Sequence, residues 1–591
     1  MTFECIKKIF SKLNTHKMPD DSLHVNAKGV QQNSYDAIVI GSGISGGWAA
    51  KELCELGLKT LVLERGRNVV HNKDYPTANK APWEFEHRGQ MPRDFISANP
   101  LITKAAGFGE DTAHFFIKDN DHPYVQDKPF NWVRGYQVGG KSLIWGRACQ
   151  RWSPFEFTSP ERLGYGINWP IGYEEVAPWY SHVEKFIGVC GNKDGVESMP
   201  DGEFLPPFDM NCMELHMKET IKNDFGRDMV QGRWAHVTQP SEVHMKTGRG
   251  RCQSRNLCMR GCPFGAYFSS VSSTIPWAEQ TGNLTIRPFS VVHSIIYDEK
   301  KGKAVGVRVI DTNTNEATEY FSRIIFVNAS ALNSNLVLLH STSSRFPNGL
   351  GNDSGLLGKY VMHHNYRAFT NAEFDGMEDK YIWGKNPTEC IIANYRNLHK
   401  QDTDYVGGFT TFTGAYRSSP DEKTMPISIG GEYKDAMGEP GKWGVYMYLQ
   451  GETIPKERNH VRLSTDKKDQ WGIPLLVMDV GYDDNDDKMV KDFLEQSVAM
   501  LEKAGGKNVF KIDNHQAPGL DIHEMGGCRM GKDPKTSLLN EHNQLHHCPN
   551  VFVTDGACMT STGNQSPSIL YMALTARAAN YATEQMKKGN L

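Results

Sequence analysis

The sequence predicts an α/β protein in which a Rossmann-like domain is joined to an α+β domain whose sheet covers it. Three observations support this fold class. Near the N-terminus, a buried strand runs into the glycine-rich turn GSGISG and then into a helix. A further buried strand and a long helix close the chain. Between them, residues 366–509 hold several segments with the composition of strands.

Length and composition narrow the class of protein. With 591 residues the chain is long enough for at least two domains, each with its own core. The net charge of −4 gives no general basic surface, so we expect no nucleic-acid binding. No apolar run reaches the roughly 18 residues of a membrane span, so no transmembrane segment is predicted. The 12 cysteines are too few for a disulfide scaffold and fit a reducing compartment.

Residues 1–29 form a leader ahead of the first strand. They contain no long apolar run with a cleavage site, which argues against a secretory signal. Apolar residues nevertheless recur at helical spacing beside lysines: Phe3, Ile6, Ile9, Phe10 and Leu13. This pattern fits an amphipathic helix on a membrane or partner, a helix on the chain's own domain, or a frayed tail.

The first strand, at residues 35–40, is followed by glycines at the spacing of a dinucleotide-binding turn. Gly41 permits the tight turn, Gly43 lets the backbone approach a pyrophosphate, and Gly46 lets the helix pack closely on the strand. Ser45 lies in the same turn, and the helix N-terminus faces the phosphate charge. The turn therefore predicts a phosphate-binding loop.

A second strand, at residues 59–63, ends at Glu64 and is followed by Arg65. At this distance from the glycines, an acidic residue accepts a hydrogen bond from the adenosine ribose and disfavours a 2′-phosphate. Strand, turn, helix and acid together predict a dinucleotide site, which could hold FAD or NAD.

The C-terminal end favours FAD. A buried strand at residues 551–554 ends in Asp555 and Gly556, and a long helix begins ten residues later, with Ser566 as its N-cap and Pro567 at its first position. The positive end of such a helix can face a flavin ring and stabilise its anionic reduced form.

Cys252, Cys258 and Cys262 stand close together in RCQSRNLCMRGCPFGA. Thiolates at this spacing suit a metal or an iron–sulfur cluster. Three reduced thiols, or a disulfide beside a spare cysteine, fit the same spacing. The cysteines alone leave these alternatives open.

Several motifs occur in the order typical of one flavoprotein family. They are GSGISG with Glu64 and Arg65, RGYQVGGKSLIWGR from Arg134, ASALNSNLVLLHS from Ala329, HEMGGCRMG from His523, and VFVTDGACMTSTGNQSPSILYMALTARAA from Val551. With them the chain resembles the glucose–methanol–choline (GMC) family of flavoprotein oxidoreductases. Residues 68–130 and 366–505 hold few such motifs.

The resemblance implies residues for the flavin and for a cluster. Small residues that line the flavin would be Gly139, Gly140 and Ser142, with Trp145 at its edge and the backbone of Val292 near the adenine. KSLIWG lacks the histidine that attaches flavin covalently in some relatives, so FAD is expected to be non-covalent. In the iron–sulfur sugar dehydrogenases of the family, three cysteines at this spacing hold a 3Fe-4S cluster. That branch implies the same ligand role for Cys252, Cys258 and Cys262.

The resemblance also implies a catalytic pair. His523 would be the base that removes the hydroxyl proton, a task for which neutral histidine is suited. Relatives add a histidine or asparagine just before the proline of the last helix, where this chain has Ser566. Either Ser566 or Asn564 is therefore expected to act with His523. His363 and His364 are adjacent, and neighbouring strand residues point to opposite faces, so we exclude both from the site.

We expect the FAD-binding domain to comprise residues 30–160, 225–365 and 510–591, and the substrate domain residues 161–224 and 366–509, with a sheet roofing the flavin. Within the latter, WGVYMYLQGE, HVRLST and PLLVMDVGY read as strands, and the chain from residue 487 reads as a helix.

The function expected from the resemblance is a dehydrogenase most like glucoside 3-dehydrogenases. It would oxidise a sugar or glucoside at the carbon-3 hydroxyl and pass electrons through FAD and a 3Fe-4S cluster to a cytochrome c or quinone. One alternative is an oxidase that reduces oxygen without a cluster, and another is a redox-inactive flavoprotein that serves as an assembly subunit. Relatives with clusters imply a small chaperone-like subunit that carries the export signal, and a periplasmic or inner-membrane-associated location. A cytoplasmic location fits the sequence equally well.

Overall fold

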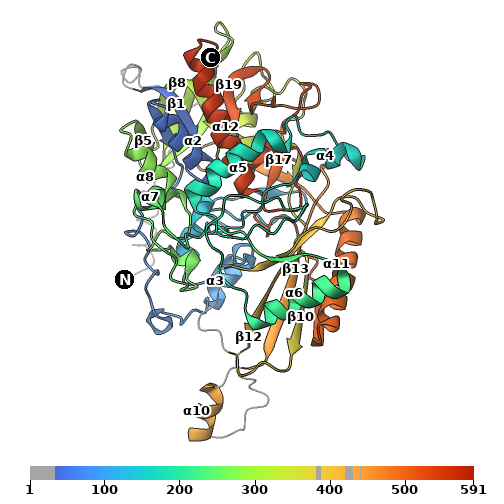
Figure 1. Ribbon diagram of the computed structural model, residues 1–591. Coiled ribbons are helices and arrows are strands. Elements are labelled where there is room, and N and C mark those ends of the chain that lie inside the picture. Colours follow the sequence, from blue (N-terminus) through green and yellow to red (C-terminus); the bar gives the residue numbers. More distant parts are fainter. Residues whose placement is uncertain (1–32, 381–387, 419–429, 439–440) are drawn as a thin grey trace, which may run out of the picture.

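The computed structural model describes residues 33–380, 388–418, 430–438 and 441–591, and the predicted leader lies outside them. The described residues form three sheets with helices packed around them (Figure 1). This arrangement confirms the predicted α/β fold class. Every helix among these residues is too short or too polar to cross a bilayer.

The first sheet is the predicted Rossmann-like sheet. Its strand order is β18-β19-β8-β1-β2-β5, with β6 and β7 attached through β8. The central strands pair in parallel and are buried on both faces, which explains their continuous apolar sequence. The strands are β1 (Ser34–Ile40), β2 (Thr60–Leu63), β5 (Leu284–Arg287), β6 (Ser290–Asp298), β7 (Lys303–Asp311), β8 (Ala317–Val327), β18 (Gln544–Leu545) and β19 (Cys548–Val553).

The apolar segment LTIRPFSVVHSI divides into the two strands β5 and β6. Pro288 has no N–H to donate to a ladder, and Phe289 adopts a left-handed φ of 56°. The chain therefore turns there, so that β5 extends the parallel sheet and β6 starts a hairpin with β7.

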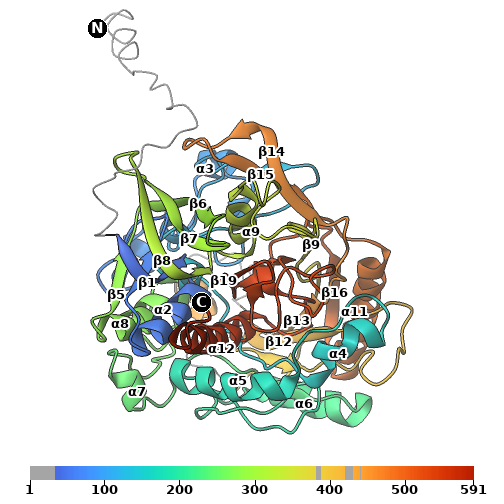
Figure 2. The same cartoon turned by 90° about the horizontal axis from the view of Figure 1, so that it is seen from above.

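Helices cover this sheet. The C-terminal helix packs against both the first helix of the nucleotide turn and a long helix of the middle of the chain (Figure 2). The helices of this region are α2 (Ile44–Glu55), α5 (Tyr173–Ile187), α8 (Thr274–Glu279), α9 (Ala331–His340) and α12 (Ser568–Lys587). Shorter helices in the described chain are α3 (Arg93–Ala98), α4 (Pro154–Arg162), α7 (Glu242–Met245) and α10 (Gly431–Gly438).

The predicted start of the last helix is wrong by one residue. α12 begins at Ser568, and its N-cap is Pro567, which makes no side-chain cap. Ser566 lies outside the helix, and its hydroxyl is 3.5 Å from Oε1 of Gln450. The serine is therefore directed to a neighbouring strand rather than to the helix amides.

The second sheet is antiparallel, in the order β16-β10-β13-β12-β11-β4. Helices α6 (Cys212–Phe225) and α11 (Asp484–Lys503) cover one face, and their apolar residues share a core with Met447 and Leu449. The alternate residues Tyr448 and Gln450 face a cavity on the other side. The strands are β4 (Met229–Gln231), β10 (Ala368–Phe374), β11 (Cys390–Ile392), β12 (Phe409–Arg417), β13 (Trp443–Gly451) and β16 (Lys507–Asp513). Strand β4 falls in the predicted FAD-domain range 225–365 and yet pairs with β11.

A third sheet is separate from the second sheet. The predicted strands HVRLST and PLLVMD form β14 (His460–Lys468) and β15 (Pro474–Asp479), which join β9 (Lys359–Met362), β17 (Met525–Gly527) and β3 (Val125–Gln126). The order is β17-β9-β14-β15-β3. Through the pairing of β9 with β17, this sheet brings the chain around residue 364 next to the chain around residue 523.

Candidate active site

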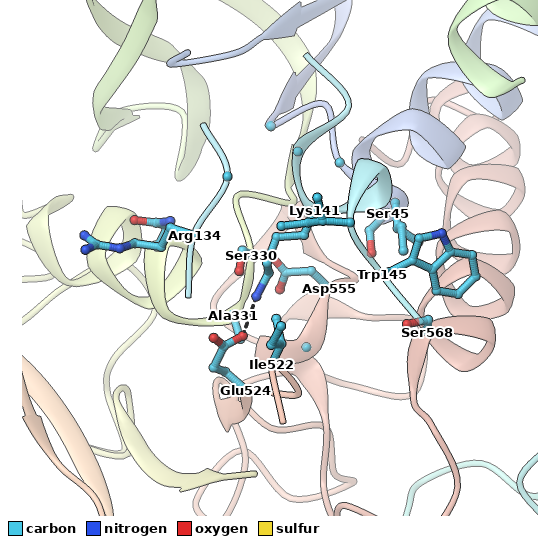
Figure 3. A pocket seen from close by; sticks show the side chains of 18 of the residues that line it. Ser45, Arg134, Lys141, Trp145, Ser330, Ala331, Ile522, Glu524, Asp555 and Ser568 are labelled. Atoms are coloured by element: carbon cyan, nitrogen blue, oxygen red, sulfur yellow. Dashed lines mark hydrogen bonds and ion pairs between the residues drawn. The ribbon is translucent and has the colours of Figure 1, made fainter. Parts of the chain in front are cut away.

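A cavity of about 640 Å³ lies between the nucleotide turn and the second sheet. Figure 3 shows Lys141, Glu524 and Asp555 around it, with Trp145 at one side. The predicted cofactor residues that line it are Gly41, Gly43, Ser45, Glu64, Arg65, Gly140, Trp145, Val292, Asp555 and Gly556. The others lie behind the lining: Gly46, Gly139, Ser142 and Pro567. The sequence therefore indicated both the wall of this cavity and the residues that support it.

The β1–α2 turn is shaped for close approach. Gly41 has a φ of 96°, and a Cβ there would stand 2.3 Å from the carbonyl oxygen of Asn328. A Cβ at Gly46 would stand 2.0 Å from the carbonyl oxygen of Gly41, so the helix can pack here only without a side chain. At Gly43 a Cβ would meet no atom within 4 Å, because this residue borders the cavity. The turn leaves room for a pyrophosphate at the N-terminus of α2.

Glu64 lines the cavity beside the β1–α2 turn. Its Oε2 accepts a 2.6 Å hydrogen bond from the Ser42 hydroxyl, and its Oε1 accepts a 2.9 Å bond from the Gly66 N–H. Burial raises the pKa of this carboxyl, whereas the bonds from Ser42 and Gly66 lower it. These donors hold Glu64 in place at the cavity wall, in the position that a ribose hydroxyl would meet.

An ion pair crosses the cavity between two distant segments. Lys141 Nζ lies 2.6 Å from Oε2 of Glu524 (Figure 3). The other oxygen of this buried carboxylate, Oε1, has no hydrogen-bond partner. Lys141 follows the glycines of the predicted flavin segment, and Glu524 follows His523. The pair therefore connects the predicted flavin segment to the segment of the predicted base.

His523 is held by His364, a residue that sequence reasoning excluded. Strands β17 and β9 are antiparallel with Met525 opposite Met362, so the residues two positions beyond, 523 and 364, also face each other. Nδ1 of His364 lies 2.8 Å from Nδ1 of His523. His363 and His364 do point in opposite directions, as expected. The exclusion of His364 is nevertheless wrong, because its ring points at His523. No local signal in the sequence reveals this cross-strand register.

The contacts of His364 determine where the protons are. Its Nε2 lies 2.9 Å from the carbonyl oxygen of Gly563, which can only accept, so Nε2 carries the proton. Burial lowers the pKa of His364 to about 4, and the neutral ring then accepts at Nδ1. Nδ1 of His523 therefore donates, and Nε2 of His523 keeps a lone pair. Burial, His364 and Lys141 hold the pKa of His523 well below its usual value, so that the ring is neutral. A neutral imidazole with a free lone pair, on the wall of the cavity, can accept a proton.

His364, Asp521 and His523 also form the one group in the described chain whose ligand atoms could surround a single metal ion. However, the two Nδ1 atoms face each other at hydrogen-bond distance. One of them donates to the other, and such a pair cannot direct both lone pairs at one ion. The arrangement is that of a hydrogen-bonded relay.

Because of Asp521, the folded protein should become less stable as the pH rises. Its Oδ2 accepts a 2.7 Å bond from the His364 N–H, while burial and the neighbouring charge of Glu524 raise its pKa to about 7. The folded protein thus binds this proton more tightly than the unfolded chain, and the free energy of unfolding decreases as the pH rises from about 4 to about 7. At about 1.36 kcal/mol per pKa unit, the pKa shift of Asp521 corresponds to a loss of stability of at most roughly 4 kcal/mol. Because the Asp521 side chain is partly exposed to the cavity, the actual loss is smaller.

The difference between wild type and Asp521→Asn isolates this carboxyl. We expect the melting temperature of wild type to drop relative to the variant between pH 5 and pH 8. A constant difference across this range would show that Asp521 titrates normally.

The two candidates for the second catalytic residue are placed differently. The Asn564 side chain accepts a 2.7 Å bond from Thr410 and donates a 3.0 Å bond to Glu156, so both ends of the amide are occupied. Ser566 lines the cavity, next to Gln450. Of these two residues, Ser566 is the one on the cavity wall.

The three clustered cysteines lie on a loop beside the cavity. Cys252, Cys258 and Cys262 line a small space of about 30 Å³, together with His236 and Tyr267. Burial raises the pKa of Cys252 to about 11, and that of Cys258 is also raised by burial, partly offset by the charge of Arg147. Among the described residues, these cysteines do not form a group whose ligand atoms could surround a single ion. Asn256 of this loop lines both the small space and the large cavity, so the two adjoin.

Several further residues of the cavity wall come from the second sheet. They are Tyr366, Glu389, Phe412, Tyr448 and Gln450. The alternation in WGVYMYLQGE was visible in the sequence and separates Tyr448 and Gln450 from the core. What it could not show is which face looks toward the nucleotide turn.

Comparisons with known proteins agree with this picture. Family profiles described as GMC oxidoreductase match residues 35–364 and 455–575. The chain is 27% identical to 2-methyl-1,2-propanediol dehydrogenase of Mycolicibacterium austroafricanum, over 93% of this chain and 95% of that protein. It is 25% identical to the fructose dehydrogenase large subunit of Gluconobacter japonicus (94% and 99% covered). To paromamine 6′-oxidase of Streptomyces fradiae it is 27% identical (92% and 90% covered).

Solved structures share the fold. Pyridoxine 4-oxidase from Mesorbium loti superposes with a TM-score of 0.56 at 16% identity, covering 92% of this chain and 98% of that one. A variant formate oxidase from Aspergillus oryzae RIB40 gives a TM-score of 0.60 at 13% identity, with 94% and 99% covered. The cavity fits the FAD of this family, and the profiles span most of the sequence. The chain therefore belongs to the GMC oxidoreductase family.

Proposed function

We propose that this protein is a FAD-dependent dehydrogenase that oxidises the carbon-3 hydroxyl of a sugar or glucoside. Its electrons leave through a 3Fe-4S cluster on Cys252, Cys258 and Cys262 to a cytochrome c or a quinone. The observation that carries the oxidation is the His523–His364 pair beside the dinucleotide cavity. The resemblance of the C-terminal block to glucoside 3-dehydrogenases supports carbon 3.

The chain's residues divide the work of alcohol oxidation. Gly41, Gly43 and Glu64 would hold FAD, which when bound takes the hydride from the carbinol carbon. His523 accepts the hydroxyl proton at Nε2, so that the C–H and O–H bonds are replaced by one C=O bond. His364 keeps the donating hydrogen on Nδ1 of His523 and thereby keeps Nε2 free to accept.

We assign the second polar contact to Ser566 rather than to Asn564. Ser566 lines the cavity, whereas the Asn564 amide is engaged by Thr410 and Glu156. Gln450, on β13, donates to the backbone carbonyl of Asn564 and lies beside the Ser566 hydroxyl. It thereby holds the loop that carries Ser566 against the second sheet. The Ser566 hydroxyl is a suitable partner for the reacting hydroxyl.

The surroundings of the cysteines support a cluster. When bound, a 3Fe-4S cluster takes up electrons one at a time. Arg147 supplies positive charge near Cys258, and its guanidinium lies 5.1 Å from the Tyr267 ring. The Tyr267 hydroxyl donates a 3.2 Å bond to the carbonyl of Trp145, which lines the large cavity. A continuous set of contacts thus joins the two spaces.

The relatives named as subunits support the assembly. The fructose dehydrogenase large subunit is, by its name, one part of a larger enzyme. We propose a small chaperone-like subunit that carries an export signal, and a periplasmic or inner-membrane-associated location. If the partner is absent, the same enzyme would work in the cytoplasm.

An oxidase without a cluster is the second candidate, because a relative of comparable identity is named paromamine 6′-oxidase. Absorption spectra before and after dithionite, together with iron analysis, separate the two. We expect flavin bands, a broad cluster absorption that bleaches, and three irons per FAD. A protein with flavin bands alone and no iron would be the oxidase.

A further inference from the structure

We propose that Glu389, held by Tyr446 and Tyr448, forms a sugar subsite that accepts uncharged sugars and glycosides and excludes sugar acids. This inference rests on the proposed function and specifies the substrate class of the same cavity. Glu389 immediately precedes β11, on the part of the second sheet that faces the cavity.

The carboxylate is fixed in position by two phenols. Its Oε1 accepts a 2.6 Å bond from the Tyr446 hydroxyl, and its Oε2 accepts a 2.9 Å bond from the Tyr448 hydroxyl. Both tyrosines come from β13, two strands away from β11. Tyr446 reaches Glu389 across β12 because its partner there, Gly414, has no side chain; a Cβ at Gly414 would stand 2.8 Å from the Tyr446 oxygen.

Aromatic rings extend the same wall. Phe412 and Tyr448 stack with ring centroids 5.1 Å apart and planes 1° apart, and Tyr366 meets Tyr448 edge-on at 5.0 Å. All three rings line the cavity. Flat apolar rings beside a fixed polar group are typical of sites that bind a small molecule with both apolar and hydroxyl faces, as a sugar ring has.

The carboxylate has capacity left for hydroxyl groups. A carboxylate offers about four lone-pair positions, of which the tyrosines use two. Sugar hydroxyls can donate to the others, and hydrogen bonds to a charged acceptor are stronger than neutral ones. A sugar carboxylate has no such donor and carries the same charge as Glu389.

A second acidic side chain lies near the proposed subsite. Burial raises the pKa of the Tyr366 hydroxyl, with further increases from the charges of Glu389 and Asp521, so both acids lie near this ring. Lys141, whose charge acts on His523, already pairs with Glu524. An anionic substrate would thus meet the carboxylate of Glu389 on the cavity wall, and repulsion between like charges selects against it.

Binding of two matched ligands tests the subsite. Methyl glucoside and methyl glucuronide differ only in the carboxylate at carbon 6, and calorimetry on the FAD-loaded protein gives both dissociation constants. We expect the glucoside to bind at least about tenfold more tightly in wild type, and Glu389→Gln to bring the two constants within about threefold. Glu389→Asp keeps the charge and serves as the matched control, so its preference for the glucoside should persist. Flavin content and melting temperature verify that each variant is folded.

The outcomes are distinct. Equal binding of both ligands by wild type, an unchanged ratio in Glu389→Gln, or no binding of either ligand would overturn the subsite. Anaerobic flavin reduction by the glucoside is measured in parallel. If the glucoside binds selectively but does not reduce the flavin, the proposed oxidation fails while the subsite stands.

Discussion

Exchange of His523 for alanine should lower the rate of sugar-driven flavin reduction by about 10²- to 10⁴-fold, the usual contribution of a general base. Alanine removes the Nε2 lone pair that the contact with His364 keeps available. FAD should remain bound, because the residues of the β1–α2 turn and Glu64 are untouched. Anaerobic stopped-flow measurement of flavin bleaching gives the rate, and the flavin spectrum gives the occupancy.

His364 provides the matched comparison. His364→Asn keeps an acceptor near the position of Nδ1, whereas His364→Leu removes it, so the asparagine variant should retain more of the rate. Unchanged reduction in His523→Ala would exclude this histidine as the base. Loss of FAD in that variant would instead indicate a structural role.

Exchange of Cys258 for serine should remove iron from the protein and abolish cytochrome c reduction, while sugar still reduces the flavin. Serine has nearly the same shape, but its oxygen is a poor ligand for a cluster that prefers soft thiolates. The half-buried Cys258 lies near Arg147, and its thiol is held protonated by burial until a metal displaces the proton. Iron analysis and electron paramagnetic resonance measure the loss of the cluster.

Cys212→Ser is the control for this change. Cys212 is equally free and partly exposed, but it lies at the first residue of α6, away from the cysteine loop. Iron content should stay at the wild-type level in this variant. Equal iron in Cys258→Ser would refute the cluster assignment.

The sequence predicted the nucleotide half of this site in detail because each of its signals is local. The β1–α2 turn depends on three glycines within six residues and on the strand before them, and Glu64 follows one βα unit later. The steric contact that requires Gly46 is made with the carbonyl of Gly41 in the same turn. Such short-range constraints can be read directly from residue spacing.

The substrate half depends on long-range pairing that spacing does not contain. His364 and His523 are 159 residues apart and meet only through the register of β9 and β17. The contact of Glu389 with Tyr446 likewise depends on the order of strands in the second sheet. The strands in HVRLST and PLLVMD were predicted, but their membership of a third sheet follows from partners that no local pattern identifies.

The β9–β17 pairing has a consequence for how this enzyme could acquire new substrates. Most of the second sheet is inserted in the chain between β9 and β17, and it contributes Glu389 and the aromatic wall. The two strands hold His364 and His523 together by their own backbone bonds. The inserted sheet can therefore change its cavity-facing residues without changing the register of β9 and β17 that brings His364 and His523 together.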